Sequence, residues 1–554
     1  MMTQQLNWDP LNTGQLFGEL FASMSRNPEK LMQANLDLWK QGLELYQRNL
    51  ENFLGGDSEP TPNTDRRFRH EAWTQQPVFN AIRESYLMLS KHVERLVDET
   101  EGLDEKTAAR AEFFTRLILD AMSPTNFAGT NPEVIERVME TSGMNLVNGF
   151  NNLVRDMKAG DGQLRIAMTD YDAFELGVNV ATTPGKVVFE NRMFQLIQYA
   201  PQTEQVSQVP LLIVPPWINK YYILDLQQKN SLIHWLVSQG HTVFIMSWVN
   251  PDESYSDVGF ENYVLEGVLE AMDQVALATG EDKVNTIGYC IGGTLLATSL
   301  AVLAGRDDNR VNSATFLTTM LDFSCPGELG VFIDKEQLDS LDEKMDQQGF
   351  LDGKEMATTF NLLRSNDLIW SFYISNYLLG NDPRPFDLLY WNSDSTRMPA
   401  KMHKWYLRNL YLKNRLIESG DIEIDGTSLD LSAIKTPAMF VSAEEDHIAP
   451  WQSTWLGARK LGGPVKFILG GSGHIAGICN PPANNKYGYR ISSRKLGKDS
   501  AAWKDRTEKH DGSWWPAWNE WVSKFAGDQV PARIPGDGKL QVIEDAPGRY
   551  VKMK

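Results

Sequence analysis

The stretch that decides the fold is VNTIGYCIGGTLLA, residues 284–297. Its first half is apolar and rich in β-forming residues, and its middle places Cys290 between Gly288 and Gly292. Its second half is a run of small and apolar residues that suits the start of a helix. A strand, a glycine-flanked turn and a helix in direct succession leave the central side chain exposed at the end of the strand. We therefore predict a sharp strand-to-helix turn with the Cys290 thiol at its tip.

This layout is that of a nucleophile elbow, written G-x-S-x-G in the α/β-hydrolase fold, with cysteine where serine is usual. A lone G-x-C-x-G is a weak signal, because free cysteines are commonly buried as small apolar side chains. The interpretation gains weight only if the rest of the chain supplies the other strands, an acid and a histidine in the right order.

The other strands of such a fold are visible as short apolar runs, which begin after about residue 175 and alternate with helical segments. The predicted strands are 186–191, 194–200, 209–216, 242–248, 284–290, 313–321, 438–445 and 465–471. Strands that are apolar throughout and separated by helices imply a parallel sheet buried on both faces. We expect an α/β-hydrolase core, with a closing helix at GSWWPAWNEWVSKF and a short ordered end at PGRYVKMK.

A gap of more than a hundred residues separates the strand after the elbow from the next strand. A βα unit needs far fewer residues, and the gap holds aromatic-rich sequence such as LLRSNDLIWSFYISNYLLGNDPRPFDLLYW. We interpret residues 323–430 as a large cap insertion over the active site.

The N-terminal part is predicted to be helical. Residues 14–54 carry apolar side chains at helical spacing and are broken near Asn27-Pro28, which indicates two amphipathic helices. The apolar residues are Leu31, Leu36, Leu38, Leu43, Tyr46 and Leu50. They either pack on the rest of the protein or form a surface for a partner or an apolar particle. Residues 55–65 read as a linker, and a second helical block runs to about residue 160.

Length and composition limit the function classes. A chain of 554 residues predicts two or three structural units, and its net charge of -19 argues against nucleic-acid binding and against attraction to an anionic membrane. Its three cysteines do not suggest a disulfide framework. No signal peptide is visible, and the apolar runs are shorter than the roughly 18 residues of a membrane helix. We expect a soluble cytoplasmic protein.

The acid and the histidine follow in the order that this fold requires. AMFVSAEEDHIAPW offers Glu444, Glu445 and Asp446, of which Asp446 is favoured because DHIAP begins the turn after the strand. VKFILGGSGHIAG then places His474 in a glycine-rich turn after the last predicted strand. The catalytic set predicted from order and spacing is therefore Cys290, Asp446 and His474.

The remaining histidines and cysteines fit less well. His447 adjoins Asp446, and it either orders the site or contacts substrate, or is a fixed turn histidine. Cys325 and Cys479 are interpreted as ordinary thiols, although Cys479 lies near His474 in sequence. The other histidines lie before the acid strand or in a charged segment near the end: His70, His92, His234, His241, His403 and His510.

The chemistry of these residue types gives each a role. His474 is expected to take the Cys290 proton, because the thiolate is the nucleophile, and Asp446 to hold the imidazole in the correct tautomer. The backbone N–H of Ile291 is expected to form half of an oxyanion hole, and the backbone of Ile218, in VPPWINKYYILDL, the other half.

Cysteine in place of serine favours acyl transfer. A thioester donor that acylates a cysteine gives another thioester, so the acyl group stays activated and can pass to a hydroxyl. Such an intermediate must be shielded from water, which a large aromatic-rich cap would do. The donor predicted by this argument is an acyl-CoA.

The sequence resembles the polyhydroxyalkanoate synthases, and most closely the class I poly(3-hydroxybutyrate) synthases. The motifs that carry the resemblance are VPPWINKYYILDL, SWVNPDES, GYCIGGTLLA, LRSNDLIWSFY, LGNDPRPFDLLYWNSDSTRMP, EEDHIAPW, GGSGHIAGICNPP and the final PGRY, from about residue 65 to the end. By this resemblance, Cys290, Asp446 and His474 fall on the family's catalytic triad.

The resemblance implies polymerisation of (R)-3-hydroxyacyl-CoA, with 3-hydroxybutyryl-CoA the expected monomer, through an acyl-cysteine and with release of CoA. It implies no cofactor or metal, a homodimer, cytoplasmic polyester granules and granule-associated partner proteins. It also implies a helical N-terminal domain, residues 1–170, for dimerisation and granule or partner contact, ahead of a catalytic domain at 171–554. Two alternatives remain: a cysteine-type thioesterase or polyester hydrolase of the same fold, and a non-catalytic granule coat, the latter suited at most to residues 1–60.

Overall fold

The computed structural model describes residues 13–53, 64–492 and 495–554. The chain divides into two compact units. The first holds the residues up to Asp170 together with Thr358–Pro385, and the second holds Tyr171–Ala357 and Phe386–Lys554. Each unit is described by itself.

The first unit is helical, as the sequence predicts. Its N-terminal helices are α1 (Thr13–Ser25), α2 (Pro28–Phe53), α3 (Ala72–Gln75), α4 (Pro77–Asp98), α5 (Glu105–Ala121), α6 (Pro132–Thr141) and α7 (Met144–Ala159). The break between α1 and α2 falls at Asn27 because Pro28 fits the first position of a helix but not its interior. Asp104 and Asn131 cap α5 and α6 by accepting backbone N–H groups of the first turn. The predicted helices in 14–54 and the helical block to residue 160 are confirmed; most of the predicted linker lies outside the described residues.

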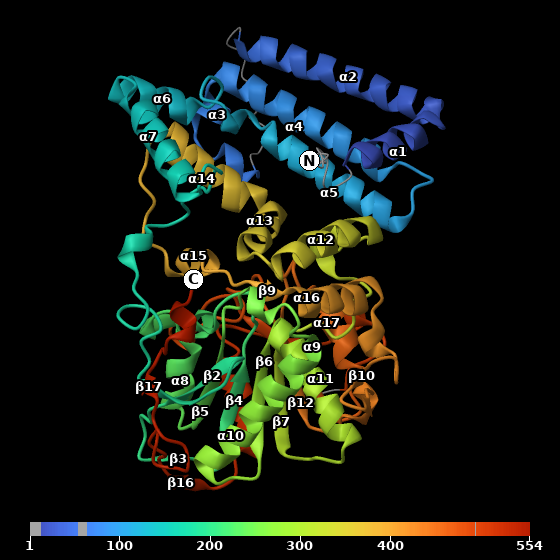
Figure 1. The fold of residues 1–554 in the computed structure, drawn as a ribbon. Coiled ribbons are helices and arrows are strands. Elements are labelled where there is room, and N and C mark those ends of the chain that lie inside the picture. The colour runs from blue at the N-terminus through green and yellow to red at the C-terminus, as the bar shows by residue number, and fades with distance from the viewer. Residues whose placement is uncertain (1–12, 54–63, 493–494) are drawn as a thin grey trace, which may run out of the picture. The chain divides into compact units, whose positions relative to one another are not determined.

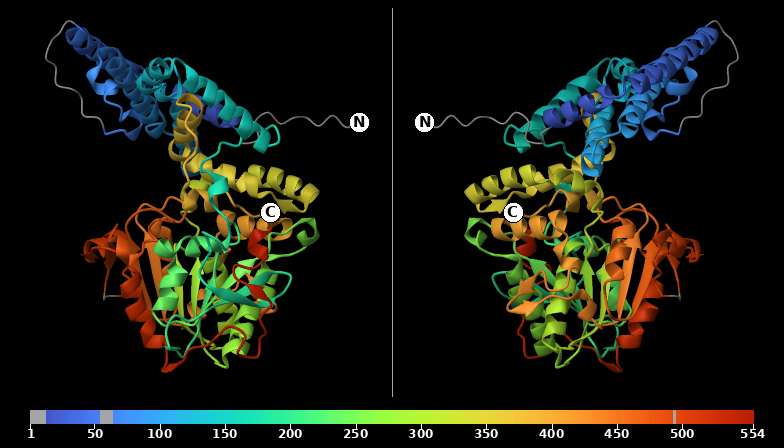
Figure 2. Two further views of the ribbon diagram at one scale, coloured as in Figure 1. Left: turned by 90° about the vertical axis from the view of Figure 1, so that its left-hand side faces the viewer. Right: turned by 90° about the vertical axis from the view of Figure 1, so that its right-hand side faces the viewer.

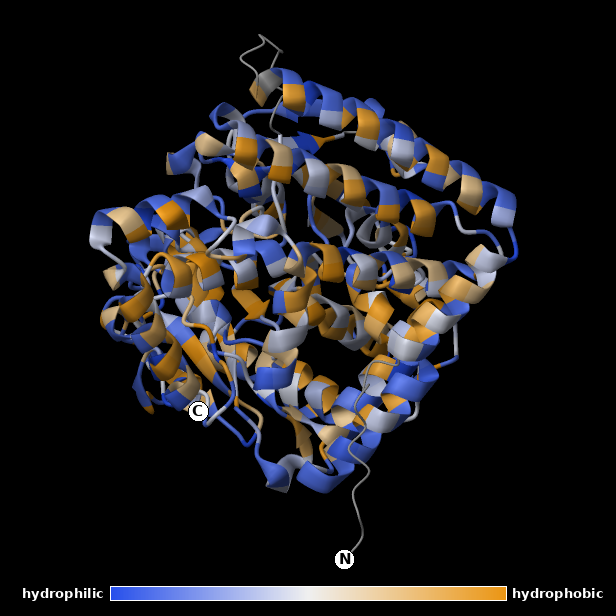
Figure 3. Cartoon of the chain, turned by 90° about the horizontal axis from the view of Figure 1, so that it is seen from above, coloured by the Kyte–Doolittle hydropathy of each residue, from blue (hydrophilic) through white to orange (hydrophobic). Residues whose placement is uncertain are grey.

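Helix α2 packs on α4 through one face and exposes the other (Figure 1). The inward face buries Ala34 and Leu45. The outward face carries large apolar side chains separated alternately by four and three positions: Met32, Leu36, Trp39, Leu43, Tyr46, Leu50 and Phe53. Figure 3 shows apolar residues recurring among polar ones along the N-terminal helices. The first alternative, packing on the rest of the protein, is confirmed for the inward face of α2, whereas a contact of the outward face with a partner or an apolar particle stays a prediction.

Residues 358–385, predicted as part of the cap, pack instead with the N-terminal helices. They include most of α13 (Gly353–Leu363) and α14 (Ser371–Tyr373), and they lie against α7. The Asn152 amide donates to the backbone carbonyls of Asn376 and Asn381 (3.1 and 3.0 Å), and the Tyr377 hydroxyl donates to Asp156 (2.6 Å). Buried polar side chains on α7 select this segment, because each one needs a hydrogen-bond partner once it leaves water.

The second unit is built on a mixed sheet, which has eleven strands in the described part of the chain. Its order is β15-β14-β13-β12-β7-β6-β4-β5-β2-β1-β17. The strands are β1 (Gly185–Glu190), β2 (Phe194–Tyr199), β4 (Leu211–Val214), β5 (Val243–Trp248), β6 (Val284–Tyr289), β7 (Val311–Leu317), β12 (Ala438–Ala443), β13 (Val465–Gly470), β14 (Tyr489–Ile491), β15 (Glu508–His510) and β17 (Glu544–Asp545). All eight predicted strands are present.

The expectation of a parallel sheet is correct only for its centre. The strands from β13 to β5 pair in parallel, whereas β1, β2, β14, β15 and β17 pair antiparallel with their neighbours. The correction has a local cause, since β1 and β2 are joined by a turn of a few residues and such a connection allows only antiparallel pairing. The central strands are buried on both faces, and their continuous apolar sequence follows from that.

Helices cover both faces of this sheet (Figures 1 and 2). One face packs against α8 (Leu232–Ser238) and α19 (Trp515–Val522), with Trp515 and Trp518 fully buried. The other packs against α10 (Glu270–Thr279), α11 (Ile291–Gly305) and α17 (Trp451–Ala458). The predicted closing helix is α19, and the chain ends in a short 3-10 turn at Tyr550–Lys552.

The part of the insertion that stays with the second unit forms helices and a small pair of antiparallel strands. These are α12 (Lys335–Gln348), α15 (Asp387–Asn392), α16 (Ala400–Tyr406), and the pair β8 (Phe350–Leu351) and β9 (Met398–Pro399). Helix α16 packs on α12 and on α9 (Phe260–Asn262). This part of the insertion supplies aromatic side chains to the candidate site.

Candidate active site

Cys290 lies in the turn between β6 and α11, as the elbow pattern predicts. Its backbone angles are φ 54° and ψ −125°, a conformation that residues with a side chain rarely adopt. The turn is held by hydrogen bonds from the Cys290 N–H to Leu317 O (2.9 Å) and from the Gly293 N–H to Cys290 O (2.9 Å). Strain of this kind persists only where the surroundings enforce it, and it is typical of functional sites.

The glycines around Cys290 are required by close contacts. A Cβ on Gly292 would lie 2.3 Å from the Val214 carbonyl oxygen at the end of β4. A Cβ on Gly288 would lie 2.4 Å from the Cα of Gly293. The turn therefore needs glycine on both sides of Cys290 because α11 starts directly against the sheet.

Asp446 and His474 form a buried pair. The His474 Nδ1 lies 2.7 Å from Asp446 Oδ2. The other carboxylate oxygen, Oδ1, accepts the backbone N–H groups of Ile448 and Ala449, both at 2.9 Å. These two donors fix the carboxylate in the turn after β12, so that one oxygen is left for the imidazole.

The Cys290 side chain also lies close enough to His474 for its charge to act on the imidazole. Burial lowers the pKa of His474, but the negative charges of Asp446 and of the Cys290 thiolate outweigh it, and the pKa is raised well above its usual value. The imidazole ring is stacked on Tyr289, with ring centroids 5.8 Å apart. The structure thus brings together Cys290, Asp446 and His474, the three residues predicted from the sequence, and their catalytic roles stay a prediction.

Two tyrosines that were not identified from the sequence lie near Cys290. Burial and the charge of the Cys290 thiolate both raise the pKa of Tyr406 and of Tyr411, so these phenols stay protonated. The rings of the two tyrosines pack edge to face, with centroids 5.6 Å apart. Trp217 and Phe323 contact the ring of Tyr406. No local motif marks Tyr406 or Tyr411, because both come from the insertion and reach the site only through its packing.

Two backbone N–H groups were predicted to stabilise an oxyanion. Ile291 is the first residue of α11, and Ile218 lies in the loop after β4. Among the described residues, neither N–H has a hydrogen-bond acceptor within the protein. Both groups are therefore available to an oxygen of a bound substrate, although their role stays a prediction.

Comparison with known proteins agrees with this architecture. Residues 64–236 match the family model described as "Poly-beta-hydroxybutyrate polymerase (PhaC) N-terminus", and residues 209–481 match the α/β-hydrolase fold model. The chain is 49% identical to the poly(3-hydroxyalkanoate) polymerase of Methylorubrum extorquens, over 96% of this chain and 88% of that protein. It is 46% identical to the poly(3-hydroxyalkanoate) polymerase subunit PhaC of Rhizobium meliloti, over 95% of this chain and 86% of that subunit. The subunit PhaC of Cupriavidus necator is 41% identical, over 92% of this chain and 88% of that subunit.

The chain belongs to the poly(3-hydroxyalkanoate) polymerase family. The family resemblance inferred from the motifs is therefore confirmed, as is the α/β-hydrolase fold with a helical N-terminal region.

The other residues considered from the sequence are His447, Cys479 and Cys325, and their surroundings do not indicate a particular role. His447 is half-buried, and its carbonyl accepts the Glu328 N–H at 3.4 Å. The Cys479 thiol donates to the Ile223 carbonyl at 3.3 Å, and burial raises its pKa to about 12, which makes it a poor nucleophile. Cys325 is exposed.

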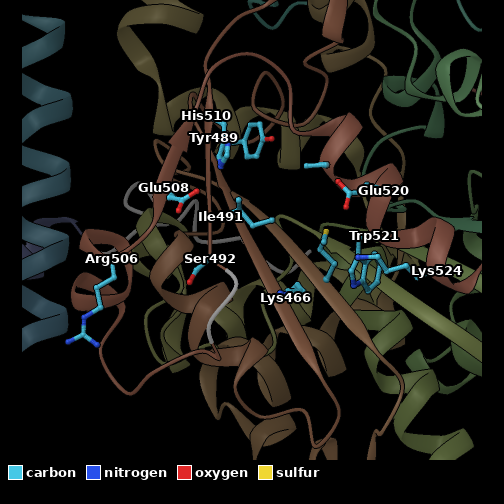
Figure 4. A pocket seen from close by; sticks show the side chains of 12 residues that line it. Lys466, Tyr489, Ile491, Ser492, Arg506, Glu508, His510, Glu520, Trp521 and Lys524 are labelled. Atoms are coloured by element: carbon cyan, nitrogen blue, oxygen red, sulfur yellow. The ribbon is translucent and has the colours of Figure 1, made fainter.

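A cavity of about 850 Å³ lies elsewhere in the polymerase, between the hairpin β14–β15 and α19 (Figure 4). Its lining includes Met439 and Lys466, the second residues of β12 and β13, whereas Asp446 and His474 follow the carboxyl ends of those strands. Tyr489, His510 and Trp521 line its walls together with charged side chains of both signs. None of the predicted site residues lines this cavity, so it is separate from the candidate active site. Within the described ranges, no group of three His, Cys, Asp or Glu residues could hold a metal ion.

Proposed function

We propose that this chain polymerises (R)-3-hydroxyacyl-CoA, with 3-hydroxybutyryl-CoA the preferred monomer, through an acyl-Cys290 intermediate. The observation that carries the proposal is the Cys290 thiol in a strained elbow, beside a buried His474 that is paired with Asp446 at 2.7 Å. Membership of the polymerase family supplies the substrate class, because the relatives are named for poly(3-hydroxyalkanoate).

The first half-reaction transfers the acyl group to the enzyme. The Cys290 thiolate attacks the thioester carbonyl, and the N–H groups of Ile291 and Ile218 stabilise the oxyanion that forms. The new carbon–sulfur bond to Cys290 replaces the bond to CoA. The CoA thiolate leaves with the proton of the His474 imidazolium, which Asp446 has kept oriented.

The second half-reaction forms the ester. Neutral His474 removes the proton from a hydroxyl of another monomer or of the chain end, and that oxygen attacks the acyl-Cys290 carbonyl. The ester forms as the Cys290 thiolate is released, and the imidazolium is restored. The cycle balances with the thioester, the hydroxyl and these side chains alone, so we propose no cofactor and no metal.

Shielding from water separates this reaction from hydrolysis. Tyr406, Trp217 and Phe323 are buried and pack around the site. An acyl-cysteine surrounded by aromatic side chains reacts with a hydroxyl that the substrate brings rather than with bulk water. The same triad acting on water would make a thioesterase or polyester hydrolase, which the product analysis below distinguishes.

The proposed setting is the cytoplasm, on the surface of polyester granules and as a homodimer. In the described residues, no helix is both long and apolar enough to cross a bilayer. The exposed apolar face of α2 supports contact with an apolar surface or a granule-associated partner, since large apolar patches on soluble proteins mark interaction sites. His447 remains a proposed accessory residue.

The deciding experiment incubates purified protein with (R)-3-hydroxybutyryl-CoA and follows CoA with a thiol reagent while the acyl product is sized. Wild type and Cys479→Ala are expected to release CoA and to form a high-mass polyester, whereas Cys290→Ala forms neither. Free 3-hydroxybutyrate as the sole acyl product would establish the hydrolase instead. CoA release that survives in Cys290→Ala would contradict the assigned nucleophile.

A further inference from the structure

The loop after β4 that holds Ile218 is paired with a segment of the insertion. Asn219 and Ser395 form an antiparallel bridge. Next to it, the backbone N–H of Thr396 donates to the Ile218 carbonyl at 3.0 Å. The loop therefore has a second strand-like neighbour from a part of the chain that lies more than 170 residues later in sequence.

The hydroxyl of the buried Thr396 side chain binds the same loop. It donates to the carbonyl of Trp217 and lies 2.9 Å from the carbonyl of Ile218. Thr396 and Trp217 are each only 3% exposed, so water cannot easily replace this donor. Both carbonyls next to the Ile218 Cα are thus held by one residue.

This contact sets the direction of the Ile218 N–H. The Trp217 carbonyl and the Ile218 N–H belong to the same peptide group, which is planar and trans, so the two bonds point in opposite directions. A hydrogen bond that fixes the carbonyl therefore also fixes the N–H. In addition, a donor on the carbonyl polarises the peptide and strengthens its N–H as a donor.

A buried ion pair anchors Lys220, two residues after Ile218 in the loop. Lys220 Nζ lies 2.9 Å from Asp394 Oδ1 and donates to the Met553 carbonyl at 2.8 Å. The Tyr222 hydroxyl donates to the other Asp394 oxygen at 2.9 Å. Lys554 Nζ lies 3.0 Å from Asp394 Oδ1 as well, so this buried carboxylate ties the insertion segment to the loop and to the C-terminal residues.

We propose that Thr396 is a positioning residue that aims the Ile218 N–H at the oxyanion of the acyl transfer. The inference rests on the proposed function, because it assigns Ile218 as a donor to the thioester oxygen. Thr396 acts through Ile218 and through its peptide with Trp217, and it does not touch the reacting atoms. The segment that carries Thr396 belongs to the insertion, so the packing of the insertion sets the geometry of the oxyanion hole.

The test compares Thr396→Val with Thr396→Ser. Valine keeps the shape of threonine and removes the hydroxyl, whereas serine keeps the hydroxyl and removes the methyl group. Loss of one oxyanion donor lowers kcat by about 10² to 10³ in other acyl-transfer enzymes, and a donor that is only misaimed should lower it by about 10- to 100-fold. We expect Thr396→Val to lower kcat for CoA release to that extent with KM within about twofold, and Thr396→Ser to stay within about threefold of wild type.

Single-turnover acylation and thermal unfolding complete the experiment. The rate of acyl-Cys290 formation in Thr396→Val should fall with kcat. If Thr396→Val does not fold, Thr396→Ala takes its place in the comparison with Thr396→Ser, because alanine adds no bulk. If the Thr396 hydroxyl had only a structural role, its removal would lower the melting temperature and the fraction of active protein. The acylation rate per active site would then be unchanged.

Three results would overturn the inference. These are an unchanged kcat in the variants without the hydroxyl, an equal loss in Thr396→Ser, and a change confined to KM. Failure of the proposed function is separate, since it would appear as a wild type that forms no polyester or as an active Cys290→Ala. The Thr396 variants are therefore compared with wild type only once CoA release by wild type has been shown to depend on Cys290.

Discussion

The turn that contains Asp446 orients its carboxylate for the role that we propose for it. Its Oδ1 is held by two backbone N–H groups, and its Oδ2 faces His474 Nδ1 at 2.7 Å. The neighbouring Glu444 points elsewhere and pairs with Lys504. Of the three consecutive acids, only Asp446 is buried, which agrees with the choice made from the turn sequence.

Asp446→Asn should lower kcat strongly because the amide cannot stabilise the imidazolium and favours the wrong tautomer. By analogy with the aspartate of serine-protease triads, we expect a loss of about 10²- to 10⁴-fold with little change in KM, measured as CoA release. Glu444→Gln is the matched control and should keep wild-type activity. Equal activity in both variants would remove Asp446 from the mechanism.

His403 predicts a pH dependence of stability. Burial lowers its pKa from 6.5 to about 4. Between these two values the unfolded chain binds a proton that the folded chain does not, so the free energy of unfolding falls as the pH drops through this window. The contribution is on the order of 3 kcal/mol at the acid end.

His403→Phe should remove this contribution, so the variant loses less stability than wild type between pH 6.5 and pH 4. Denaturant unfolding at several pH values measures the difference. His234→Gln, at a half-buried position, serves as the control. Parallel stability curves for His403→Phe and wild type would show that the buried imidazole is not the cause.

Among the elements, α11 shows how closely the elbow is packed. Its residues are mostly small or apolar, and all of them from Ile291 to Leu303 are buried. The helix begins in contact with the end of β4, where the carbonyl of Val214 approaches Gly292. This arrangement leaves no space for a side chain on the glycine that follows the nucleophile.

Gly292→Ala should therefore lower the free energy of unfolding by about 3 kcal/mol or more, since the added methyl group meets backbone that cannot move away. Gly497→Ala is the control, because a Cβ there meets nothing within 4 Å, and it should change stability by less than about 0.5 kcal/mol. Denaturant midpoints of the two variants test this. A stable Gly292→Ala would mean that α11 can shift away from the sheet.

At the scale of the whole molecule, the outward face of α2 stands out because it is exposed and takes no part in the packing of its own unit. Trp39 is 71% exposed and Leu43 is 49% exposed, on a helix whose other face is packed on α4. Leaving such side chains in water is unfavourable, at about 25 cal/mol per Å² of apolar surface. We expect the proposed granule or partner contact to cover this face.

The double variant Trp39→Gln, Leu43→Gln should lose association with polyester particles while its CoA release per active site stays within about twofold of wild type. Co-sedimentation with particles of poly(3-hydroxybutyrate) measures the first property and the thiol assay the second. Gln41→Ala on the same helix is the control and should bind as wild type does. Undiminished sedimentation of the double variant would assign particle binding to another surface.

The sequence by itself determined the elements and the order of the chemical groups. The strands β1, β2, β4, β5, β6, β7, β12 and β13 and the helices α1 and α2 follow from the local pattern of apolar residues along the chain. The elbow at Cys290, the acid at Asp446 and the histidine at His474 follow from turn chemistry after successive strands. These three side chains come together because the parallel strands that precede them end at the same edge of the sheet.

Only the tertiary structure decided which segments are partners. Residues 358–385 join α7 because Asn152 and Asp156 find hydrogen-bond partners there, more than 200 residues away in sequence. In the same way, Thr396 reaches the loop of Ile218, and the antiparallel edge strands take their places beside the parallel centre. Hydrogen bonds between distant segments leave no periodic trace in either segment, and the burial that makes them necessary exists only in the folded chain.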